Sequence, residues 1–575
     1  MERGSFYWPK GICRHLAYPE IPVHAILESA ALIAPQRNAI IFAGMEITYA
    51  ELDRLSARFA SGLARLGVEK GDRVAVHLPN CPHFAIAYYG LLKAGAVFVP
   101  VSPLLSEGEI EFQLRDAGAK VLITLDLLSG APRAVLANTP VQELVVASIA
   151  DCYPPLGLAV KPLRKAGTEE GRDFLDLLRD GDDPPAVEID PRADLAHLSY
   201  TGGTTGSPKG VMLTHFNVVA NSCQFARWFA GGDVTYQDGR LGVRREPGDS
   251  EERYPTGLAR EVSLGVVPWF HAFGTIGYLN TLVIGCTTMV VFARFDPAEY
   301  LQAIGKYRAT VMGGAPQLFI ALVENPLFQD VDMSGLRLVV SGAAPISPQL
   351  LETMREKTAA VICEGYGLTE ATMGCTETPP FPEDIRLGSV GIPVADTEIR
   401  IVDPESGEEA PLGEPGEICV RGPQVMKGYW GRPEETARVL KEGWLHTGDI
   451  GRLDPDGYLF IVDRLKDMIL YKGYNVYPRE LEEVLDGHPL VQQSAVVDKP
   501  DPRAGEIPVA FVMLKEGASL TAAELMDFAN SRLAAYKKIR ELYFVHSLPV
   551  NLAGKVLRRE LREMLKREGG AGPTG

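Results

Sequence analysis

The feature of this sequence that most restricts its fold is the alternation of helix and strand patterns in the N-terminal third. Short apolar runs that suit buried strands alternate with longer amphipathic stretches, and glycines separate the two. This β-α-β order is typical of a parallel sheet with helices on its faces. The predicted strands are 73–78, 97–101 and 121–124; the predicted helices run from the Thr48/Glu51 capping box to Gly67, over 82–93, and onward from the Ser106/Glu109 capping box.

The same pattern returns at 310–344, where two apolar strands run into glycine-rich turns. In parallel sheets of this kind, ligands bind beyond the carboxyl ends of the strands. Residues 231–261 interrupt the pattern, because they are polar, rich in Gly and Pro and poor in large aliphatic side chains. We interpret them as a surface insertion whose purpose the sequence leaves open.

A compact α+β pattern follows the turn-rich stretch 446–475. It consists of a helix from Pro478, strands at 494–498 and 509–514, and helices at 521–534 and 555–567. We therefore predict an α/β protein with two domains. The large multi-sheet α/β domain spans 1–463, and a small, mobile α+β domain spans 464–575.

The charge of the chain is unevenly distributed. The formal net charge is −17, but the last 112 residues carry 17 Lys+Arg against 15 Asp+Glu, whereas residues 1–463 carry 40 against 59. An acidic protein of this kind lacks the broad basic face of a nucleic-acid-binding protein, so we expect no nucleic-acid partner. A few local cations and backbone N–H groups can still hold a phosphate.

The cysteines and the hydropathy pattern favour a cytoplasmic protein. The eight cysteines are scattered singly and form no C-x-x-C motif, which is typical of reduced thiols. No run of ~18 apolar residues could span a bilayer, and the first residues lack the apolar core of a signal peptide. We expect neither an integral membrane protein nor a secreted one.

The most informative segment is the glycine- and threonine-rich stretch 200–210, YTGGTTGSPKG. Glycines let backbone N–H groups approach an anion, and the hydroxyls and Lys209 add further donors, so the stretch is interpreted as a phosphate-binding loop. It follows the apolar run LAHLSY and precedes a helix predicted to start near Thr214. It is not a Walker A loop, which requires Gly at Pro208 and Ser or Thr at Gly210.

This loop closely resembles the signature of the adenylate-forming superfamily, which contains acyl-CoA synthetases, peptide-synthetase adenylation domains and luciferases. Further motifs resemble those of the family in the same order, and the resemblance extends from about residue 20 to 567. They are SGAAP (341–345), YGLTE (366–370), TGD (447–449), DRLKD (463–467) and NLAGKVLRR (551–559).

The resemblance implies the fold of that superfamily and a set of site residues. Activating an acid brings two anions together, so the protein must neutralise charge and fix an in-line geometry. The implied catalytic residues are Lys555, Glu370, His271 and Thr201, and the implied Mg²⁺ ligands are Thr201 and Glu370. Nucleotide or CoA binding is implied for Thr201, Gly202, Gly203, Thr204, Thr205, Gly206, Lys209, Gly342, Ala343, Ala344, Gly365, Tyr366, Gly367, Thr369, Asp449, Arg464, Lys466, Gly473, Tyr474 and Lys555.

Plainer explanations exist for several of these residues. Glu370 suits a helix start, Asp449 suits a turn, and His271 suits a hydrogen-bonded core histidine. Lys555 lies in a basic stretch, which is usually a solvated face. The lysine motif also departs from the commoner family form, with Val550 in place of Lys, Ala553 in place of Ser or Thr, and Ile539 in place of Pro, so we expect altered local packing there.

The segment VVPWFHAFG (266–274) resembles the part of the family that borders the acid-binding pocket. An amino-acid-activating relative would carry an Asp nearby to pair the substrate ammonium, and none is present among Trp269, Phe270, His271 and Phe273. Gly313 and Gly314 resemble small residues of the pocket wall, which would leave room for an acyl chain. The sequence therefore favours an apolar carboxylic acid.

We predict a fatty acyl-CoA ligase whose cofactors are ATP and Mg²⁺, with coenzyme A as co-substrate. The expected partners are small molecules, and we leave open a homodimer and a peripheral contact with a membrane that supplies acyl chains. Three alternatives stay open: an aryl-acid ligase of the coumarate or benzoate type, an acyl-AMP ligase that delivers to a carrier protein, and a non-enzymatic acyl or nucleotide sensor. The sequence does not specify acyl chain length, oligomeric state or physiological pathway.

Overall fold

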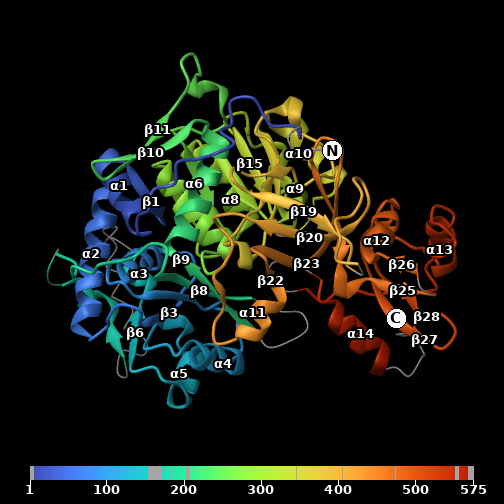
Figure 1. Ribbon diagram of the computed structural model, residues 1–575, viewed down its shortest axis with the longest axis horizontal. Coiled ribbons are helices and arrows are strands. Elements are labelled where there is room, and N and C mark those ends of the chain that lie inside the picture. The colour runs from blue at the N-terminus through green and yellow to red at the C-terminus, as the bar shows by residue number, and fades with distance from the viewer. Residues whose placement is uncertain are drawn as a thin grey trace.

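The computed structural model describes residues 6–152, 171–179, 181, 183–201, 208–342, 344, 346–404, 406–472, 474–550 and 556–567. It confirms the predicted fold class, with a large α/β part and a smaller α+β part at the C-terminus (Figure 1). The boundary between residues 463 and 464 remains a prediction. None of the described helices is both long enough and apolar enough to cross a membrane.

The first large sheet contains the strands predicted in the N-terminal third. Its inner strands are parallel, and β9 and β21 extend it in antiparallel fashion. The strands, in spatial order, are β21 (Gly428–Tyr429), β9 (Lys209–Thr214), β8 (Leu195–Thr201), β4 (Val97–Pro100), β3 (Arg73–His77), β5 (Val121–Leu125), β6 (Glu143–Ala147) and β7 (Arg172–Asp173). The helices in this part are α2 (Tyr49–Arg65), α3 (Pro82–Lys93), α4 (Glu107–Ala117) and α5 (Gly130–Val135).

The second large sheet combines N-terminal and central strands, with a parallel core from β1 to β16. Its spatial order is β18 (Ile392–Pro393), β17 (Thr376–Glu377), β16 (Val361–Tyr366), β15 (Leu338–Ser341), β14 (Val311–Gly314), β12 (Val262–Gly265), β13 (Thr288–Val291), β1 (Asn38–Phe42) and β2 (Met45–Thr48). The helices that accompany it are α1 (Ala25–Ile33), α6 (His215–Ala230), α7 (Thr281–Ile284), α8 (Pro297–Tyr307), α9 (Pro316–Glu324) and α10 (Pro348–Lys357).

One apolar core joins these two sheets through α3 and α6. It includes Val74 and Ala196 from the first sheet, Met289 from the second, Leu91 from α3 and Val219 from α6. Every residue of α3 and of α6 is buried, as expected of helices that are covered on all sides. A polar side chain on α6 consequently needs a partner inside the protein or inside a ligand site.

A third, antiparallel sheet leads towards the C-terminal part. It consists of β19 (Glu398–Val402), β20 (Gly416–Arg421), β23 (Trp444–Leu453), β22 (Leu440–Lys441) and β24 (Leu459–Arg464), with α11 (Pro433–Val439) beside it. The C-terminal sheet stands apart from the body in Figure 1 and has its own apolar clusters. It consists of β26 (Tyr474–Val476), β25 (Ile469–Tyr471), β28 (Gly505–Leu514), β27 (Val491–Asp501) and β29 (Glu541–Phe544), with α12 (Pro478–Asp486), α13 (Ala522–Asn530) and α14 (Arg558–Arg567).

Much of 231–261 lies at the surface, as predicted, but part of it is ordered and packs against the body. Part of it forms a β-hairpin, β10 (Asp233–Gln237) with β11 (Arg240–Arg244), whose Leu241 packs into the main core. Tyr254 is fully buried in another cluster. The turn residues Asp238 and Gly239 both have positive φ, +49° and +76°, which is the conformation that an Asp-Gly hairpin turn adopts.

Candidate active site

Thr201 and Lys209 lie at the two ends of a hairpin in the first sheet. β8 ends at Thr201, β9 begins at Lys209, and the two residues are paired across the antiparallel ladder. The predicted loop residues Gly202, Gly203, Thr204, Thr205 and Gly206 fall between them, outside the described residues. The helix predicted near Thr214 begins at His215, but β9 separates it from the loop. The loop therefore connects two strands and does not lead directly into a helix N-terminus.

Lys209 connects this hairpin to Glu370. The Lys209 Nζ forms an ion pair with Glu435 and lies 4.9 Å from the centroid of the Tyr429 ring. The Tyr429 hydroxyl donates a 2.8 Å hydrogen bond to Glu370 Oε1. Glu370 and Thr369 belong to one short 3₁₀ turn, Thr369–Ala371. Burial raises the pKa of Glu370, and the Tyr429 hydrogen bond and Lys209 partly offset that rise.

Asp449 is held between Tyr366 and Arg464. The Tyr366 hydroxyl donates to Asp449 Oδ2 at 2.7 Å, and Arg464 Nε lies 3.3 Å from Asp449 Oδ1. Tyr366 ends β16, whereas Asp449 and Arg464 are direct partners across β23 and β24. The structure thus brings together three predicted residues from motifs far apart in the sequence. Asp449 presents a carboxylate that is already oriented from both sides.

The turn that carries Asp449 is held by residues that sequence reasoning missed. Glu417 Oε1 accepts the Gly448 N–H at 3.1 Å, and its Oε2 lies 2.7 Å from His446 Nδ1. Cys419 Sγ lies 3.4 Å from the same nitrogen, so a carboxylate, a thiol and an imidazole meet at one point. These atoms already bond to each other or to the turn. The cluster therefore positions the Asp449 turn.

The predicted glycines on the nucleotide side have packing reasons for lacking a side chain. A Cβ on Gly367 would lie 1.7 Å from the Met373 carbonyl oxygen, so only glycine allows the two backbones to approach there. Gly342, Ala344 and Gly365 lie at or beyond the ends of β15 and β16, where a ligand of a parallel sheet is expected. Ala343 lies outside the described residues.

His271 precedes a π-helix, Phe273–Asn280, a type of helix often found at functional sites. The backbone N–H of Phe273 donates to His271 Nδ1 at 3.4 Å, which leaves the other ring nitrogen as the site of the proton. His271 is exposed, and desolvation lowers the pKa of its imidazole, which favours the neutral ring.

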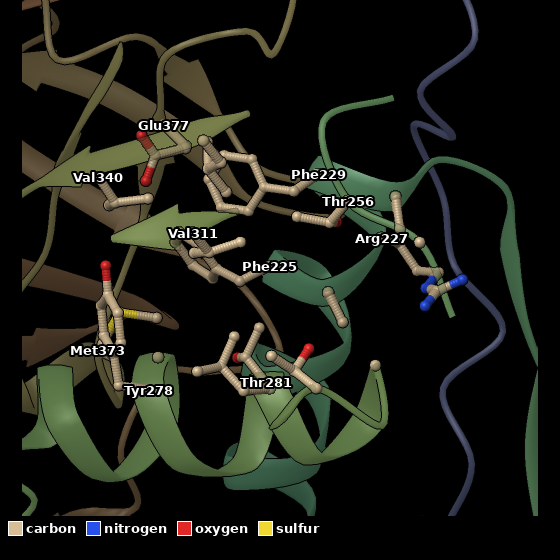
Figure 2. A pocket seen from close by; sticks show the side chains of 18 of the residues that line it. Phe225, Arg227, Phe229, Thr256, Tyr278, Thr281, Val311, Val340, Met373 and Glu377 are labelled. Carbon is tan, nitrogen blue, oxygen red and sulfur yellow. The ribbon is translucent and has the colours of Figure 1, made fainter. Parts of the chain in front are cut away.

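An elongated pocket runs from this π-helix between α6, α7 and strands β14 and β15 (Figure 2). Most of its lining is apolar, including Phe225, Val311 and Val340. Arg227 and Glu377 are the basic and acidic exceptions among the lining residues. An apolar wall with few polar groups is typical of small-molecule sites.

The expectation that Gly313 and Gly314 leave room for an acyl chain is wrong. A Cβ on Gly313 would lie 1.5 Å from the Tyr278 hydroxyl oxygen, and Leu318 covers Gly314 in the same way. The space over both glycines is thus filled by side chains of the protein. The pocket instead runs along Val311 of the same strand.

The C-terminal candidates are only partly described. Lys466 belongs to the 3₁₀ turn Leu465–Asp467, but its side chain lies outside the description, as do Gly473 and Lys555 altogether. Tyr474 begins β26 and is 58% exposed, with its ring stacked on Tyr536 at a centroid distance of 5.0 Å. No predicted role in this domain is tested by these contacts.

The chain matches two models of one family in order. Residues 27–430 match the AMP-binding enzyme model, and residues 480–555 match the model of the AMP-binding enzyme C-terminal domain. The long-chain-fatty-acid–CoA ligase of Bacillus subtilis is 39% identical over 568 residues, with 97% of each chain covered. The 4-coumarate–CoA ligase 1 of Solanum tuberosum is 36% identical, covering 90% of this chain and 89% of the relative.

Solved structures also match the chain over nearly its whole length. The anthranilate CoA ligase AuaEII in complex with anthranoyl-AMP superposes with a TM-score of 0.82 at 27% identity, covering 96% of this chain and 99% of that one. The fatty acyl CoA synthetase of Mycobacterium tuberculosis has a TM-score of 0.70 at 30% identity, covering 95% and 99%. With both domain models matched in order and relatives aligned over nearly the whole chain, this protein belongs to the AMP-binding enzyme family.

Proposed function

We propose that this protein is a fatty acyl-CoA ligase that forms AMP. In the first step a carboxylate oxygen of the fatty acid attacks the α-phosphorus of ATP and pyrophosphate leaves. In the second, the CoA thiolate attacks the acyl carbonyl carbon and AMP leaves. The observation that carries the proposal is an apolar pocket lined in part by Met373, whose carbonyl oxygen packs against Gly367 of the YGLTE motif, in a chain 39% identical to a long-chain-fatty-acid–CoA ligase.

The proposed nucleotide site consists of the residues that the fold gathers at the sheet ends. Asp449 would accept hydrogen bonds from the ribose hydroxyls, with its orientation fixed by Tyr366 and Arg464. Lys209 and the Thr201 loop would lie along the β- and γ-phosphates. Because phosphoryl transfer depends on positioning and charge neutralisation, these fixed donors supply most of what the reaction requires.

Glu370 is the described residue best suited to hold Mg²⁺. Its carboxylate is a hard oxygen ligand, and burial raises its pKa, so a bound cation would compensate an anion that the protein leaves without a full counter-charge. Bound Mg²⁺ would neutralise charge on the phosphate oxygens. The Tyr429 hydrogen bond keeps the Glu370 side chain in one orientation, and the Thr201 hydroxyl is proposed as a further ligand.

The C-terminal domain would provide a further positive charge, that of Lys555. Lys555, by resemblance, would bridge the carboxylate and α-phosphate oxygens in the first step. Rotation of the domain about Lys466 would then bring Gly473 and Tyr474 to the path of the CoA pantetheine. The exposed ring of Tyr474 is compatible with such a surface role.

An aryl-acid ligase is the second candidate. Two observations favour it: the 36% identity to a 4-coumarate–CoA ligase over 90% of the chain, and the buried hydroxyl of Tyr278, which has no hydrogen-bond partner among the described residues and borders the pocket. A phenolic substrate would give that hydroxyl a partner.

The test compares palmitate, octanoate and coumarate with ATP and Mg²⁺, with and without CoA. We expect equimolar acyl-CoA and AMP, with an aliphatic acid preferred. Glu370→Gln should lower turnover about 100-fold and raise the Mg²⁺ concentration needed, whereas Glu398→Gln on the exposed edge of β19 should change neither. Preference for coumarate would replace the lead proposal with the second candidate, and accumulation of acyl-AMP in the presence of CoA would exclude both ligases.

A further inference from the structure

Arg227 is a buried cation for which the described residues provide no side-chain partner. It lies in the last turn of α6, and only 5% of its surface is exposed. Its Nη1 atom has no hydrogen-bond partner, and its guanidinium forms no ion pair within the described part of the chain. An arginine normally enters the protein interior only with a carboxylate or several acceptors, because an unpaired buried charge is costly.

The surroundings of Arg227 leave this charge uncompensated. Burial lowers the pKa of Arg227 to about 10, so the side chain is still cationic at neutral pH, and nearby Arg245 adds a second positive charge. Glu251 is the neighbouring acid with the largest effect, but its Oε1 accepts the Leu258 N–H at 2.8 Å. Arg245 donates to the Ala230 carbonyl at 2.6 Å. No carboxylate of the described residues forms an ion pair with Arg227.

Arg227 is one of the residues that line the pocket. Tyr278 and Met373 lie at one end of it, and Arg227 lies at the other, beside Thr256 (Figure 2). The first end adjoins the proposed reaction centre, because the Phe273 ring packs against Tyr278 at a centroid distance of 5.4 Å and also covers Gly342. A substrate whose carboxylate reacts at that end would extend its far end towards Arg227.

We propose that Arg227 binds a second carboxylate at the far end of the substrate, so that the preferred acids are α,ω-dicarboxylic acids. A guanidinium can donate two parallel hydrogen bonds to a carboxylate, and such pairs are strongest where water is excluded. The apolar walls between the two ends contact the methylene chain. The inference rests on the proposed ligase function and specifies its substrate class.

The segment 231–261 contributes to this end of the pocket. Thr256 and Gly257 line it, and Arg245 stands beside Arg227. The segment is fixed in place by Tyr254, whose carbonyl oxygen accepts a 2.9 Å hydrogen bond from Arg337 and whose hydroxyl donates to the Gly11 carbonyl at 2.8 Å. The insertion thus forms the wall that faces the substrate's far carboxylate.

The test measures kcat/KM for monocarboxylic and α,ω-dicarboxylic acids matched in chain length from eight to sixteen carbons. At the best length, Arg227→Met should lower the diacid-to-monoacid ratio at least 10-fold, through a loss of kcat/KM for the diacid. Arg227→Lys should lower the ratio less, because lysine keeps the positive charge but cannot donate two parallel hydrogen bonds to one carboxylate. Arg240→Met, which removes an exposed charge from the same insertion, should leave the ratio unchanged.

An equal ratio in the wild type and Arg227→Met at every length would overturn the inference. If Arg227→Met does not fold, the wild type decides: it should prefer a diacid over its half methyl ester at least 10-fold, and equal turnover of the two overturns the inference. Failure here differs from failure of the ligase proposal. In the first case monoacids still give acyl-CoA and AMP; in the second no acid does.

Discussion

Two arginines, the buried Arg227 in the large domain and the partly buried Arg558 in the C-terminal domain, have opposite surroundings. Arg558 is in contact with Glu482 at 2.8 Å, Asp467 at 3.5 Å and Asp463 at 3.8 Å. Burial by itself lowers the pKa of Arg558, but these carboxylates outweigh it and the pKa is raised, whereas the pKa of Arg227 falls to about 10. The comparison separates a cation whose partners are within the chain from a cation whose partner we propose to be a ligand.

The largest expected effect concerns the cation that the C-terminal domain would bring to the large domain. Lys555→Ala should reduce acyl-AMP formation about 10³-fold, because charge developing in the transition state loses its donor. Thioester formation from supplied acyl-AMP should stay within a factor of a few, since that step does not need the lysine. Pyrophosphate release and acyl-CoA formation measure the two half-reactions. Lys566→Ala on α14 is the control, and equal loss of both half-reactions contradicts the assigned role.

The next effect tests whether Arg558 is structural. Arg558→Met leaves three carboxylates without their shared partner and should lower the free energy of opening of β27 and β28 by about 3 kcal/mol. Native-state hydrogen exchange measures that free energy. Arg559→Met is the matched control, because that side chain is exposed and pairs with Glu563 one turn away, and losing this pair should cost less than about 0.5 kcal/mol. A similar loss of opening free energy in both variants would mean that Arg558 is not a structural cation, and its contrast with Arg227 would no longer hold.

The smallest effect concerns Glu377, an unpaired acid in the same pocket as Arg227. Burial raises its pKa well above that of an ordinary Glu, and only the Thr378 N–H donates to it among the described contacts. The folded state therefore keeps a proton that the unfolded state loses above about pH 4.5, and stability falls by up to about 1.4 kcal/mol per pH unit until the folded pKa is reached.

Glu377→Gln should remove this part of the pH dependence, so that the variant gains on the wild type between pH 5 and 7. Denaturant unfolding at several pH values measures it, with Glu356→Gln on α10 as an exposed control. Parallel stability curves for the wild type and Glu377→Gln would mean that Glu377 is ionised in the folded protein. Glu377 would then resemble the ionised carboxylates that surround Arg558.

The sequence was sufficient for features whose cause is local. Both predicted capping boxes form, at Thr48 with Glu51 and at Ser106 with Glu109, because each is set by residues three apart. The order of strands in the sheets was not predictable in this way. Ile40 pairs with Met289, and no local pattern specifies a partner so distant in the chain.

The site residues also fall into those that a local sequence motif identifies and those that only the fold identifies. Motif resemblance identified Tyr366, Asp449 and Arg464, which the fold then brings within hydrogen-bond or ion-pair distance. Arg227 and Tyr429 carry no motif, and only tertiary packing brings them to the site. The Asp238–Gly239 turn is different, because its hairpin signal is local and was outweighed by the polar composition around it.

The hairpin insertion has a consequence for how such proteins diversify. It leaves the scaffold at the end of α6, Ala230, and rejoins it at the start of β12, Val262, so both attachment points belong to elements that the insertion does not itself form. Its Leu241 packs into the main core and its Tyr254 is buried, so a new segment at this place would have to keep both contacts. Under the proposed function, changes at its other positions would alter the pocket wall beside Arg227, while the strands that carry Tyr366 and Asp449 keep their register.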